Sequence, residues 1–247
     1  MSNWVEATVK DVKWWSETLF SLTLNADIAP FKAGQFTKLS IMDGEKRIAR
    51  AYSFVNAPEN PNLEFYLINV IDGLLSPYLA KLKPGETVLI EQRATGFFTL
   101  DEIPQSEQLW MLGTGTAIGP FLSILQQPDV WQKYKSINIV HGVRFNNDLS
   151  YQALINELLR VYPEQLNYIP VVSREEPLQG LSSRITSAIE NNRLFEHVNL
   201  QPTPNNAQFM ICGNPQMVKD TTNLLLAKNF TRNRRKDPGN ITVEQYW

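Results

Sequence analysis

Cysteine is almost absent from this sequence, because Cys212 is the only one among 247 residues. A single thiol excludes an internal disulfide, a multi-cysteine zinc site and an iron-sulfur cluster ligated by this chain, since each needs several thiolates. Histidine is almost as scarce, and neither His141 nor His197 has a cysteine or second histidine close in sequence. We therefore expect no metal site. A position beside Arg144 would let His141 contact a cofactor, but a core histidine hydrogen-bonded to the backbone is the better interpretation.

Long apolar runs and an excess of charge are also missing. Residues 1–13 are interrupted by charges every few positions, which does not fit a signal peptide, and no later run is long enough to span a membrane. Lys and Arg total 23 against 25 Asp and Glu, so the formal charge of -2 does not fit nucleic-acid binding. We expect a cytoplasmic monomer that binds neither nucleic acid nor membrane.

What the sequence does contain predicts two domains, one of β and one of α/β class. Residues 1–101 read as a six-stranded antiparallel β-barrel, and residues 102–247 as a parallel-sheet α/β domain. Barrel strands are expected at 4–12, 18–25, 35–41, 51–55, 63–71 and 86–92. Strands of the second domain are expected at 108–112, 137–141, 166–172 and 207–212, with helices that begin near Ala117, Leu149, Ser182 and Pro215.

The segment Arg50-Ala51-Tyr52-Ser53 gathers a cation, an aromatic ring and a hydroxyl within four residues of a β-like run. Guanidinium can pair with phosphate, the ring can stack on a planar ligand, and the hydroxyl can hydrogen-bond to a ring nitrogen. Strict alternation places Arg50 and Tyr52 on one face of the strand and Ser53 on the other. On these four residues alone, an ordinary barrel strand is the better interpretation.

A short helix is expected after Gly73, with Ser76 as its N-cap and Pro77 at its first position. The free amide groups at such a helix start can bind an anion, although a plain helix cap explains the segment equally well. A second glycine-rich turn, GTGTAIGP at 113–120, lets the backbone approach a phosphate, but its spacing is not that of a standard GxGxxG fingerprint.

Polar residues follow the next strands of the α/β domain. Val143-Arg144 follows the second strand and Ser173-Arg174 the third, with Arg184 in the next helix. Nucleotides bind at the carboxyl ends of such strands, so three guanidiniums and a hydroxyl could hold the 2'-phosphate of NADP. The alternative is a set of solvated arginines neutralised by the adjacent Glu175 and Glu176.

The last third of the chain adds three segments of interest. In CGNPQM at 212–217, Asn214 can cap a helix that Pro215 begins, while a lone cysteine is more often a buried hydrophobe than a catalytic group. The chain ends in VEQYW, where two exposed aromatic rings would be poorly used unless they stack on something. Between these segments, residues 228–236 hold five cations and no acid, which is normally a solvated loop.

RAYS, GTGTAIGP, CGNPQM and VEQYW occur together in the order found in one family, and they span nearly the whole chain. The sequence resembles the bacterial ferredoxin (flavodoxin)-NADP reductases of the gammaproteobacterial type. This resemblance implies FAD in the barrel, NADP(H) in the α/β domain, hydride transfer between the two cofactors, and single electrons exchanged with ferredoxin or flavodoxin. The basic run would then bind these acidic carriers.

The resemblance also implies roles for individual residues. For FAD it implies Arg50, Ala51, Tyr52, Ser53, Phe65, Tyr66, Leu67, Leu74, Leu75, Ser76, Tyr246 and Trp247. For NADP(H) it implies Thr116 at the flavin-nicotinamide junction, Val143, Arg144, Ser173, Arg174, Arg184, Asn214, Pro215, Gln216 and Asp220. Ser53, Cys212, Glu244 and Tyr246 are the implied catalytic residues.

Two other functions are compatible with the same sequence. A related enzyme that reduces free flavin or another redox protein with NADPH would share nearly every motif. A non-catalytic nucleotide-binding redox sensor could use the same two domains.

Overall fold

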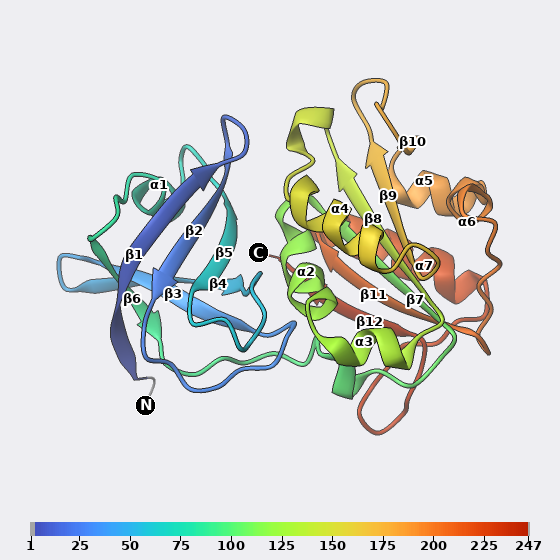
Figure 1. Cartoon of the computed structure of the whole chain (residues 1–247), viewed down its shortest axis with the longest axis horizontal. Helices are drawn as coiled ribbons and strands as arrows, with labels where there is room; N and C mark the ends of the chain where they lie inside the picture. The colour runs from blue at the N-terminus through green and yellow to red at the C-terminus, as the bar shows by residue number, and fades with distance from the viewer. Residues whose placement is uncertain (1–2, 247) are drawn as a thin grey trace. The chain divides into compact units, whose positions relative to one another are not determined.

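The computed structural model describes residues 3–246, and its contacts divide the chain into two compact units (Figure 1). The first unit runs to Thr99 and also includes Gly119–Gln127, and the second comprises Leu100–Ile118 and the chain from Pro128 onward. No helix among the described residues has the length and apolar character needed to cross a bilayer.

The first unit is built on one antiparallel sheet of six strands in the order β4-β3-β6-β1-β2-β5. The strands are β1 (Trp4–Trp14), β2 (Leu19–Asn25), β3 (Phe36–Asp43), β4 (Lys46–Ser53), β5 (Leu63–Ile68) and β6 (Thr87–Glu91). An antiparallel bridge from Phe54 to Phe65 brings the chain after β4 onto β5, so the two edge strands meet. This closure confirms the predicted six-stranded barrel.

Aromatic residues pack together in the barrel core. Phe54 is fully buried, stacks on Phe31 with ring centroids 3.9 Å apart, and contacts Phe65 at 5.1 Å. The helix α1 (Ser76–Leu79) adds the buried Leu79 to the same core. Phe31, Phe54 and Phe65 are therefore used for packing.

The helix α2 (Gly119–Leu125) belongs to the first unit although its sequence position lies in the second half. Ser123 Oγ donates to Asn56 O at 2.7 Å, and Gln126 Nε2 donates to Val55 O at 2.8 Å. Asn56 is itself buried and accepts from Glu64 N through Oδ1 at 2.8 Å. These polar contacts hold α2 against the loop that follows β4.

The second unit contains a six-stranded sheet in the order β10-β9-β8-β7-β11-β12, and every neighbouring pair in it is parallel. The strands are β7 (Gln108–Thr114), β8 (Ser136–Val143), β9 (Leu166–Val172), β10 (Leu181–Ser182), β11 (Ala207–Gly213) and β12 (Ile241–Gln245). The predicted parallel sheet is thereby confirmed, and the C-terminal segment forms its edge strand.

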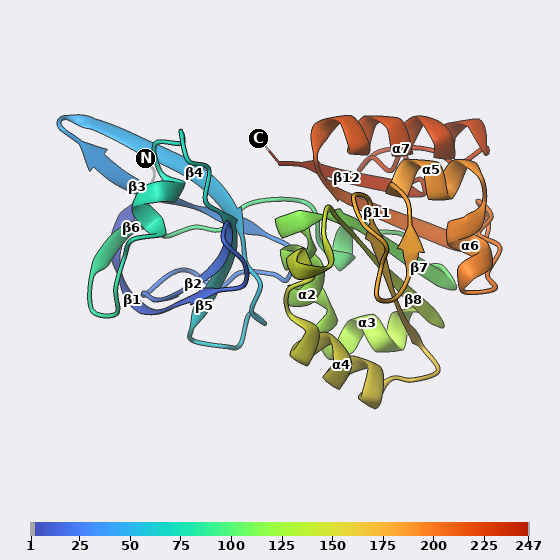
Figure 2. The same cartoon turned by 90° about the horizontal axis from the view of Figure 1, so that it is seen from above.

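Helices cover both faces of this sheet. They are α3 (Pro128–Lys133), α4 (Gln152–Val161), α5 (Ile185–Glu190), α6 (Arg193–His197) and α7 (Pro215–Ala227), with short 3₁₀ helices at Leu100–Glu102, Gly115–Ile118 and Asn146–Asp148. Figure 2 shows α3 and α4 on one face and α5 and α7 on the other. Successive side chains along each strand therefore face opposite helical layers.

The structure corrects several boundaries. Strand β4 begins at Lys46, whereas the sequence predicted a strand only from Ala51, because Lys46 and Arg47 mask its alternation. Sequence reading also missed α3, α6 and the two-residue β10, which are too short for periodicity to reveal. Ser76 is not an N-cap, since Leu75 holds that position without a side-chain hydrogen bond.

Candidate functional site

In the barrel, the RAYS segment lies at the end of β4. Arg50 is exposed and donates through Nη1 to Ala49 O at 2.8 Å, Tyr52 is half-buried against the core, and Ser53 is buried. Burial raises the pKa of Tyr52 to about 12, and the nearby Arg50 charge opposes that rise. The segment thus offers an exposed guanidinium beside a neutral phenol ring.

The neighbouring strand β5 presents its predicted residues unequally. Phe65 and Leu67 point into the barrel core, where both are at most 1% exposed. Tyr66 lies on the other face of the strand and is also buried, at 4% exposed. A ligand could therefore contact Phe65 and Leu67 only through their main chain.

Around α1, Leu74 is 65% exposed, whereas Leu75 is buried in the barrel core. The Ser76 hydroxyl accepts from Val70 N at 3.0 Å, so it fixes the preceding loop. Pro77 occupies the first turn of the helix as predicted. Of the three predicted residues here, only Leu74 offers an exposed side chain.

In the second unit, the predicted residues gather at the carboxyl edge of the parallel sheet. Thr116 follows β7, Arg144 follows β8, Arg174 follows β9, and Asn214 follows β11. The chain order reverses beside β7, since β8 lies on one side of it and β11 on the other. Such a switch point leaves a crevice outside the strand ends, which is where open α/β sheets bind ligands.

The two turns at this switch point are tied together by one hydrogen bond. Asn214 N donates to Thr114 Oγ1 at 3.0 Å, and a Cβ on Gly213 would lie only 2.2 Å from the same oxygen. Gly213 has φ +127, which side-chain-bearing residues rarely adopt. Asn214 caps α7 by accepting from Gln216 N and Met217 N at 3.0 and 3.2 Å, as predicted. Sequence reading overlooked Thr114, which only this spatial pairing reveals.

Further along α7, Gln216 Nε2 donates to Asp220 Oδ1 at 2.8 Å. Pro215 begins the helix, as the sequence predicted. The Gln216–Asp220 pair spans one helical turn, so Asp220 fixes the Gln216 amide near the start of α7.

Cys212 of β11 is paired with one residue on each of the two neighbouring strands. It pairs with Gly113 of β7 on one side and with Glu244 of β12 on the other. Burial raises the pKa of the Cys212 thiol well above its usual value, the Glu244 charge raises it further, and hydrogen bonds from Tyr246 and Gly213 oppose the rise. The thiol is therefore neutral, which excludes a thiolate nucleophile at physiological pH.

The C-terminal segment is held beside the same strand. Tyr246 N donates to Gly213 O at 3.1 Å, so the chain after β12 follows the edge of β11. Trp247 lies outside the described residues.

The three predicted arginines of the nucleotide site are exposed, as is Ser173. Ser173 Oγ donates to Val143 O at 3.1 Å, and Arg174 N donates to Arg144 O at 3.0 Å, so the turns after β8 and β9 are joined. Glu175 accepts from Asn146 N and from Asn146 Nδ2, and no ion pair within residues 3–246 links it to these arginines. The cations thus remain available to an anionic ligand.

The expected core histidine is confirmed. His141 is fully buried, and its Nε2 lies 3.1 Å from Gly115 O in the glycine-rich turn. Gly115 has φ +54 with open space around its missing Cβ, so conformation and not crowding favours glycine there.

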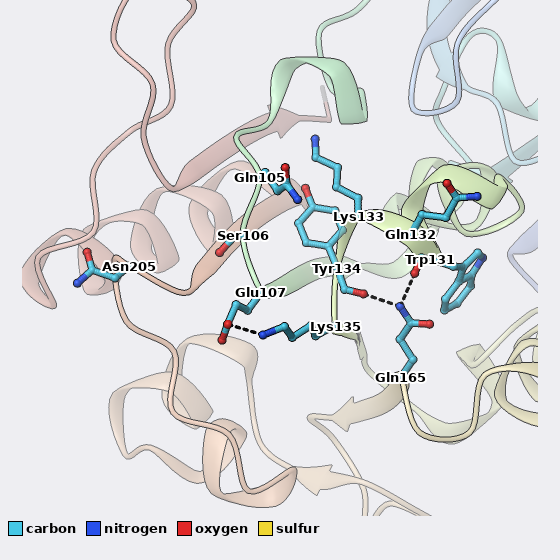
Figure 3. Close-up of a pocket in the computed structure, with 10 residues that line it drawn as sticks. All are labelled: Gln105, Ser106, Glu107, Trp131, Gln132, Lys133, Tyr134, Lys135, Gln165 and Asn205. Carbon is cyan, nitrogen blue, oxygen red and sulfur yellow. Dashed lines mark hydrogen bonds and ion pairs between the residues drawn. The ribbon is translucent and has the colours of Figure 1, made fainter.

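A cavity of about 570 Å³ lies in the second unit, at the opposite edge of the sheet (Figure 3). It is lined by residues before β7 and β8, among them Glu107, Lys135 and Tyr134. Glu107 and Lys135 pair there at 2.6 Å. The predicted site residues all lie elsewhere, so this cavity is separate from the strand ends that carry the nucleotide motifs.

Comparison with known proteins assigns both units. The model of the oxidoreductase FAD-binding domain matches residues 8–97, and the model of the oxidoreductase NAD-binding domain matches residues 111–223. A flavodoxin/ferredoxin-NADP reductase of Escherichia coli (strain K12) is 49% identical over 249 residues, with 100% of each chain covered. A ferredoxin-NADP reductase of Pseudomonas aeruginosa is 33% identical, with 99% and 98% covered.

A solved structure agrees over the same length. The crystal structure of a ferredoxin NADP+ reductase from Neisseria gonorrhoeae, with bound FAD and NADP, has a TM-score of 0.93 and 34% identity, with 100% of both chains covered.

Proposed function

This chain belongs to the family of flavodoxin/ferredoxin-NADP reductases, and from that membership we infer its activity. It is an FAD-dependent oxidoreductase that transfers hydride between NADPH and FAD, and single electrons between FAD and ferredoxin or flavodoxin. Its cofactors are FAD and NADP(H). The observation that carries this conclusion is the full-length similarity, in which each unit matches the domain model for one cofactor.

The chemistry of the barrel residues fits FAD. Arg50 offers an exposed cation for phosphate, Tyr52 a neutral ring for stacking, and Ser53 a hydroxyl for a ring nitrogen. We assign further contacts to Ala51, to the main chain of Phe65 and Leu67, to Tyr66, and to the segment Leu74, Leu75 and Ser76. The cofactor supplies the redox chemistry, and the chain binds and orients it.

The carboxyl edge of the second unit fits NADP(H). Thr116, Asn214, Pro215, Gln216 and Asp220 lie at or near the switch point. Val143 ends β8 and Arg144 follows it, whereas the sequence placed both after the strand. Ser173 and Arg174 follow β9, and Arg184 is the N-cap of α5, not a residue within that helix as predicted. Exposed guanidiniums favour the 2'-phosphate of NADP.

Arg174→Ala should raise KM for NADPH about tenfold and leave KM for NADH unchanged, because the variant loses a charged hydrogen bond that only the 2'-phosphate can accept. Arg193→Ala, on α6, is the matched control, and equal effects of both variants would contradict the assignment.

For the reaction itself we propose that Ser53 steadies the flavin ring, while Cys212 and Glu244 shape the nicotinamide pocket. A neutral thiol fits this steric role. Ser53→Ala should retain FAD but slow flavin reduction by NADPH in stopped-flow absorbance. Reduction at the wild-type rate in that variant would remove Ser53 from the mechanism.

We propose that Tyr246 and Trp247 cover the flavin, as the resemblance implies. Deletion of both residues should weaken FAD retention and increase affinity for the nicotinamide nucleotide. Gel filtration followed by flavin absorbance measures retention, and NADP+ titration measures affinity. Unchanged values of both would contradict the covering role.

The decisive experiment is the visible absorption spectrum of the purified protein before and after NADPH under anaerobic conditions. A yellow protein that NADPH bleaches supports the reductase, whereas a colourless protein that takes up no FAD would overturn it. A slow or absent bleach of bound flavin would favour the redox sensor. Turnover with purified flavodoxin, ferredoxin and free flavin then separates the carrier reductase from a free-flavin reductase.

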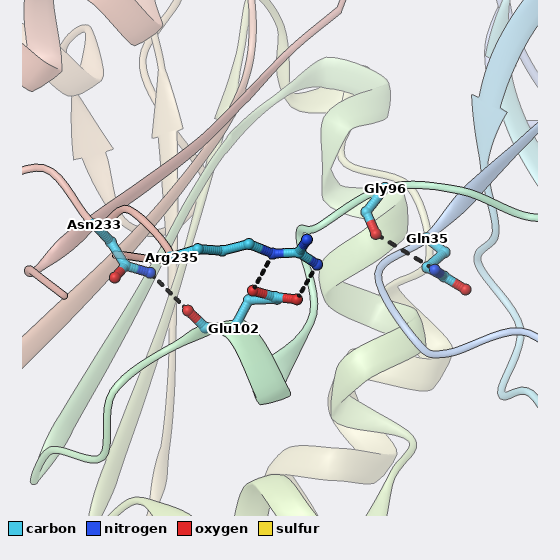
Figure 4. Close-up of polar contacts among 5 residues, drawn as sticks. All are labelled: Gln35, Gly96, Glu102, Asn233 and Arg235. Carbon is cyan, nitrogen blue, oxygen red and sulfur yellow. Dashed lines mark hydrogen bonds and ion pairs between the residues drawn. The ribbon is translucent and has the colours of Figure 1, made fainter. Parts of the chain in front are cut away.

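The basic segment 228–236 is the proposed binding surface for an acidic electron carrier. Arg235 pairs with Glu102 through Nη2 at 2.7 Å, and Asn233 donates to Glu102 O at 2.7 Å (Figure 4). Lys228, Arg232, Arg234 and Lys236 are exposed. Association between opposite charges weakens as salt rises, so an electron-transfer rate to the carrier that does not change with ionic strength would contradict this proposal.

We also expect a cytoplasmic monomer. Light scattering tests the oligomeric state, and cell fractionation tests the localisation.

A further inference from the structure

A chain of polar side chains runs behind the glycine-rich turn that follows β7. His141 Nε2 lies 3.1 Å from Gly115 O, and its Nδ1 lies 3.2 Å from the Tyr168 hydroxyl. Gln152 Nε2 donates to the same hydroxyl at 3.0 Å. The three side chains come from β8, β9 and the start of α4, so packing of α4 on the sheet assembles them.

Chemistry fixes the direction of each hydrogen bond in this chain. A carbonyl oxygen only accepts, so His141 Nε2 must carry the proton toward Gly115. In the neutral ring Nδ1 is then an acceptor, and the Tyr168 hydroxyl donates to it. The hydroxyl oxygen is left to accept from Gln152. The arrangement therefore specifies one tautomer of His141.

The ring is neutral as this scheme requires. Burial lowers the pKa of His141 to about 4, and the hydrogen bond to the Gly115 backbone only partly offsets that effect. Burial also raises the pKa of Tyr168 to about 12, so its proton stays in place at physiological pH.

The Gly115 carbonyl controls where the next amide points. In a trans peptide the carbonyl oxygen of one residue and the N–H of the next lie on opposite sides. Gly115 has no side chain, its φ is +54, and nothing lies within 4 Å of the position of a Cβ. Together with the 3₁₀ helix Gly115–Ile118, the bond from His141 therefore fixes the Gly115–Thr116 peptide plane, with the Thr116 N–H on the side opposite to the carbonyl that faces His141.

We propose that His141 is a positioning residue for the nicotinamide nucleotide. Through the Gly115 carbonyl it sets the peptide plane that presents Thr116 to the nucleotide, and Tyr168 with Gln152 holds the ring in the required tautomer. This assignment rests on the function inferred above for the carboxyl edge of the sheet.

The first test removes the Tyr168 hydroxyl, whose hydrogen bond to Nδ1 holds His141 in one tautomer. In Tyr168→Phe no donor faces Nδ1, so the ring can take the other tautomer, whose Nε2 lone pair would oppose the Gly115 carbonyl. We expect KM for NADPH to rise about tenfold, the worth of one buried hydrogen bond, with kcat and FAD content little changed. Tyr134→Phe is the matched control, because that buried hydroxyl has no hydrogen-bond partner among the described residues and lies at the opposite edge of the sheet.

The second test uses a donor that has no tautomers. His141→Gln keeps an N–H of similar reach, so it should retain more NADPH affinity than His141→Leu. In the His141→Gln background, Tyr168→Phe should cost nothing further, whereas a purely structural role of the Tyr168 hydroxyl would cost the same in both backgrounds. The ¹⁵N spectrum of the wild-type His141 ring should show the proton on Nε2.

Three results would overturn the proposal: a proton on Nδ1, a KM in Tyr168→Phe equal to that of Tyr134→Phe, or equal costs of Tyr168→Phe in both backgrounds. These three results can be distinguished from a result that refutes the proposed reductase activity. If NADPH does not reduce the wild-type flavin, the function fails, whereas normal wild-type reduction with any of these results refutes only the positioning role.

Discussion

The two units build their candidate sites by opposite strategies. In the barrel, the central residues are contiguous in one strand, β4, which carries Arg50, Tyr52 and Ser53 within four positions. In the α/β unit, the residues are spread over the ends of β7, β8, β9, β11 and β12, and only the parallel topology brings those ends to one edge. A contiguous motif is readable from sequence, whereas an assembled edge requires the fold.

The local charges of the two sites also differ in sign. In the barrel, the Arg50 charge opposes the rise in the pKa of Tyr52, so it favours an anion there. At the end of the sheet, the Glu244 charge adds to the rise in the pKa of Cys212, so it disfavours an anion there. A positive site suits the phosphates of FAD, and a negative one suits the cationic ring of oxidised nicotinamide.

The largest expected effect comes from a glycine that only the assembled edge requires. Gly213→Ala would place a Cβ 2.2 Å from Thr114 Oγ1 at φ +127, so backbone strain, crowding and loss of the Asn214 bond combine. We expect a loss of about 4 kcal/mol in local stability around β11. In the barrel, Gly85→Ala meets no atom within 4 Å at φ +92, so strain alone should cost about 1 to 2 kcal/mol.

Native-state hydrogen exchange measures both changes strand by strand. Equal losses in the two variants would contradict the difference between the contiguous and the assembled site.

The next largest effect is a pH dependence confined to the α/β unit. The folded-state pKa of His141 is about 4, below the ordinary 6.5, so the unfolded chain binds more protons between these values. Stability should therefore be complete above pH 6.5 and fall as pH drops toward 4, by up to about 3 kcal/mol. Denaturant titrations at several pH values measure the slope, which His141→Gln should remove. A slope that persists in that variant would assign it to other groups.

A smaller effect is expected at the contiguous site. Arg50→Ala removes the exposed guanidinium of β4, so FAD should bind ten- to one-hundredfold more weakly, the worth of a charged hydrogen bond. Arg47→Ala is the matched control on the same strand, where the guanidinium lies 4.8 Å from the Trp4 ring. Fluorescence of released FAD measures both. Equal weakening by the two variants would show that Arg50 has no specific role.

Sequence reading succeeded where a local rule decides the structure. The strand Leu166–Val172 and the Asn214 cap with Pro215 were predicted at their observed positions, because a β-rich apolar run and capping chemistry are local signals. The same kind of β-rich apolar run predicted that Arg144 and Arg174 come after two neighbouring strands, as they do after β8 and β9.

Sequence reading failed where distant residues decide. Ser76 was predicted to cap α1, but its hydroxyl accepts from Val70 N. The Thr114–Asn214 bond joins residues 100 positions apart, so no local pattern announces it. The same limit applies to the tautomer of His141, which depends on Tyr168, 27 positions away.

The smallest expected effect tests the negative end of the charge comparison. Glu244→Gln removes the charge that, after burial, contributes most to the raised pKa of Cys212, so that pKa should fall while burial keeps it above the usual value. Because Cys212 is the only cysteine, its alkylation rate as a function of pH, read by mass spectrometry, measures this shift without interference. The onset of alkylation should move to lower pH, and Gln245→Glu, one position along the same strand and on the other face, should leave it unchanged. An onset of alkylation that stays at the same pH in Glu244→Gln would mean that the Glu244 charge does not raise the pKa of Cys212. The two sites would then differ in how they are assembled but not in their local charge.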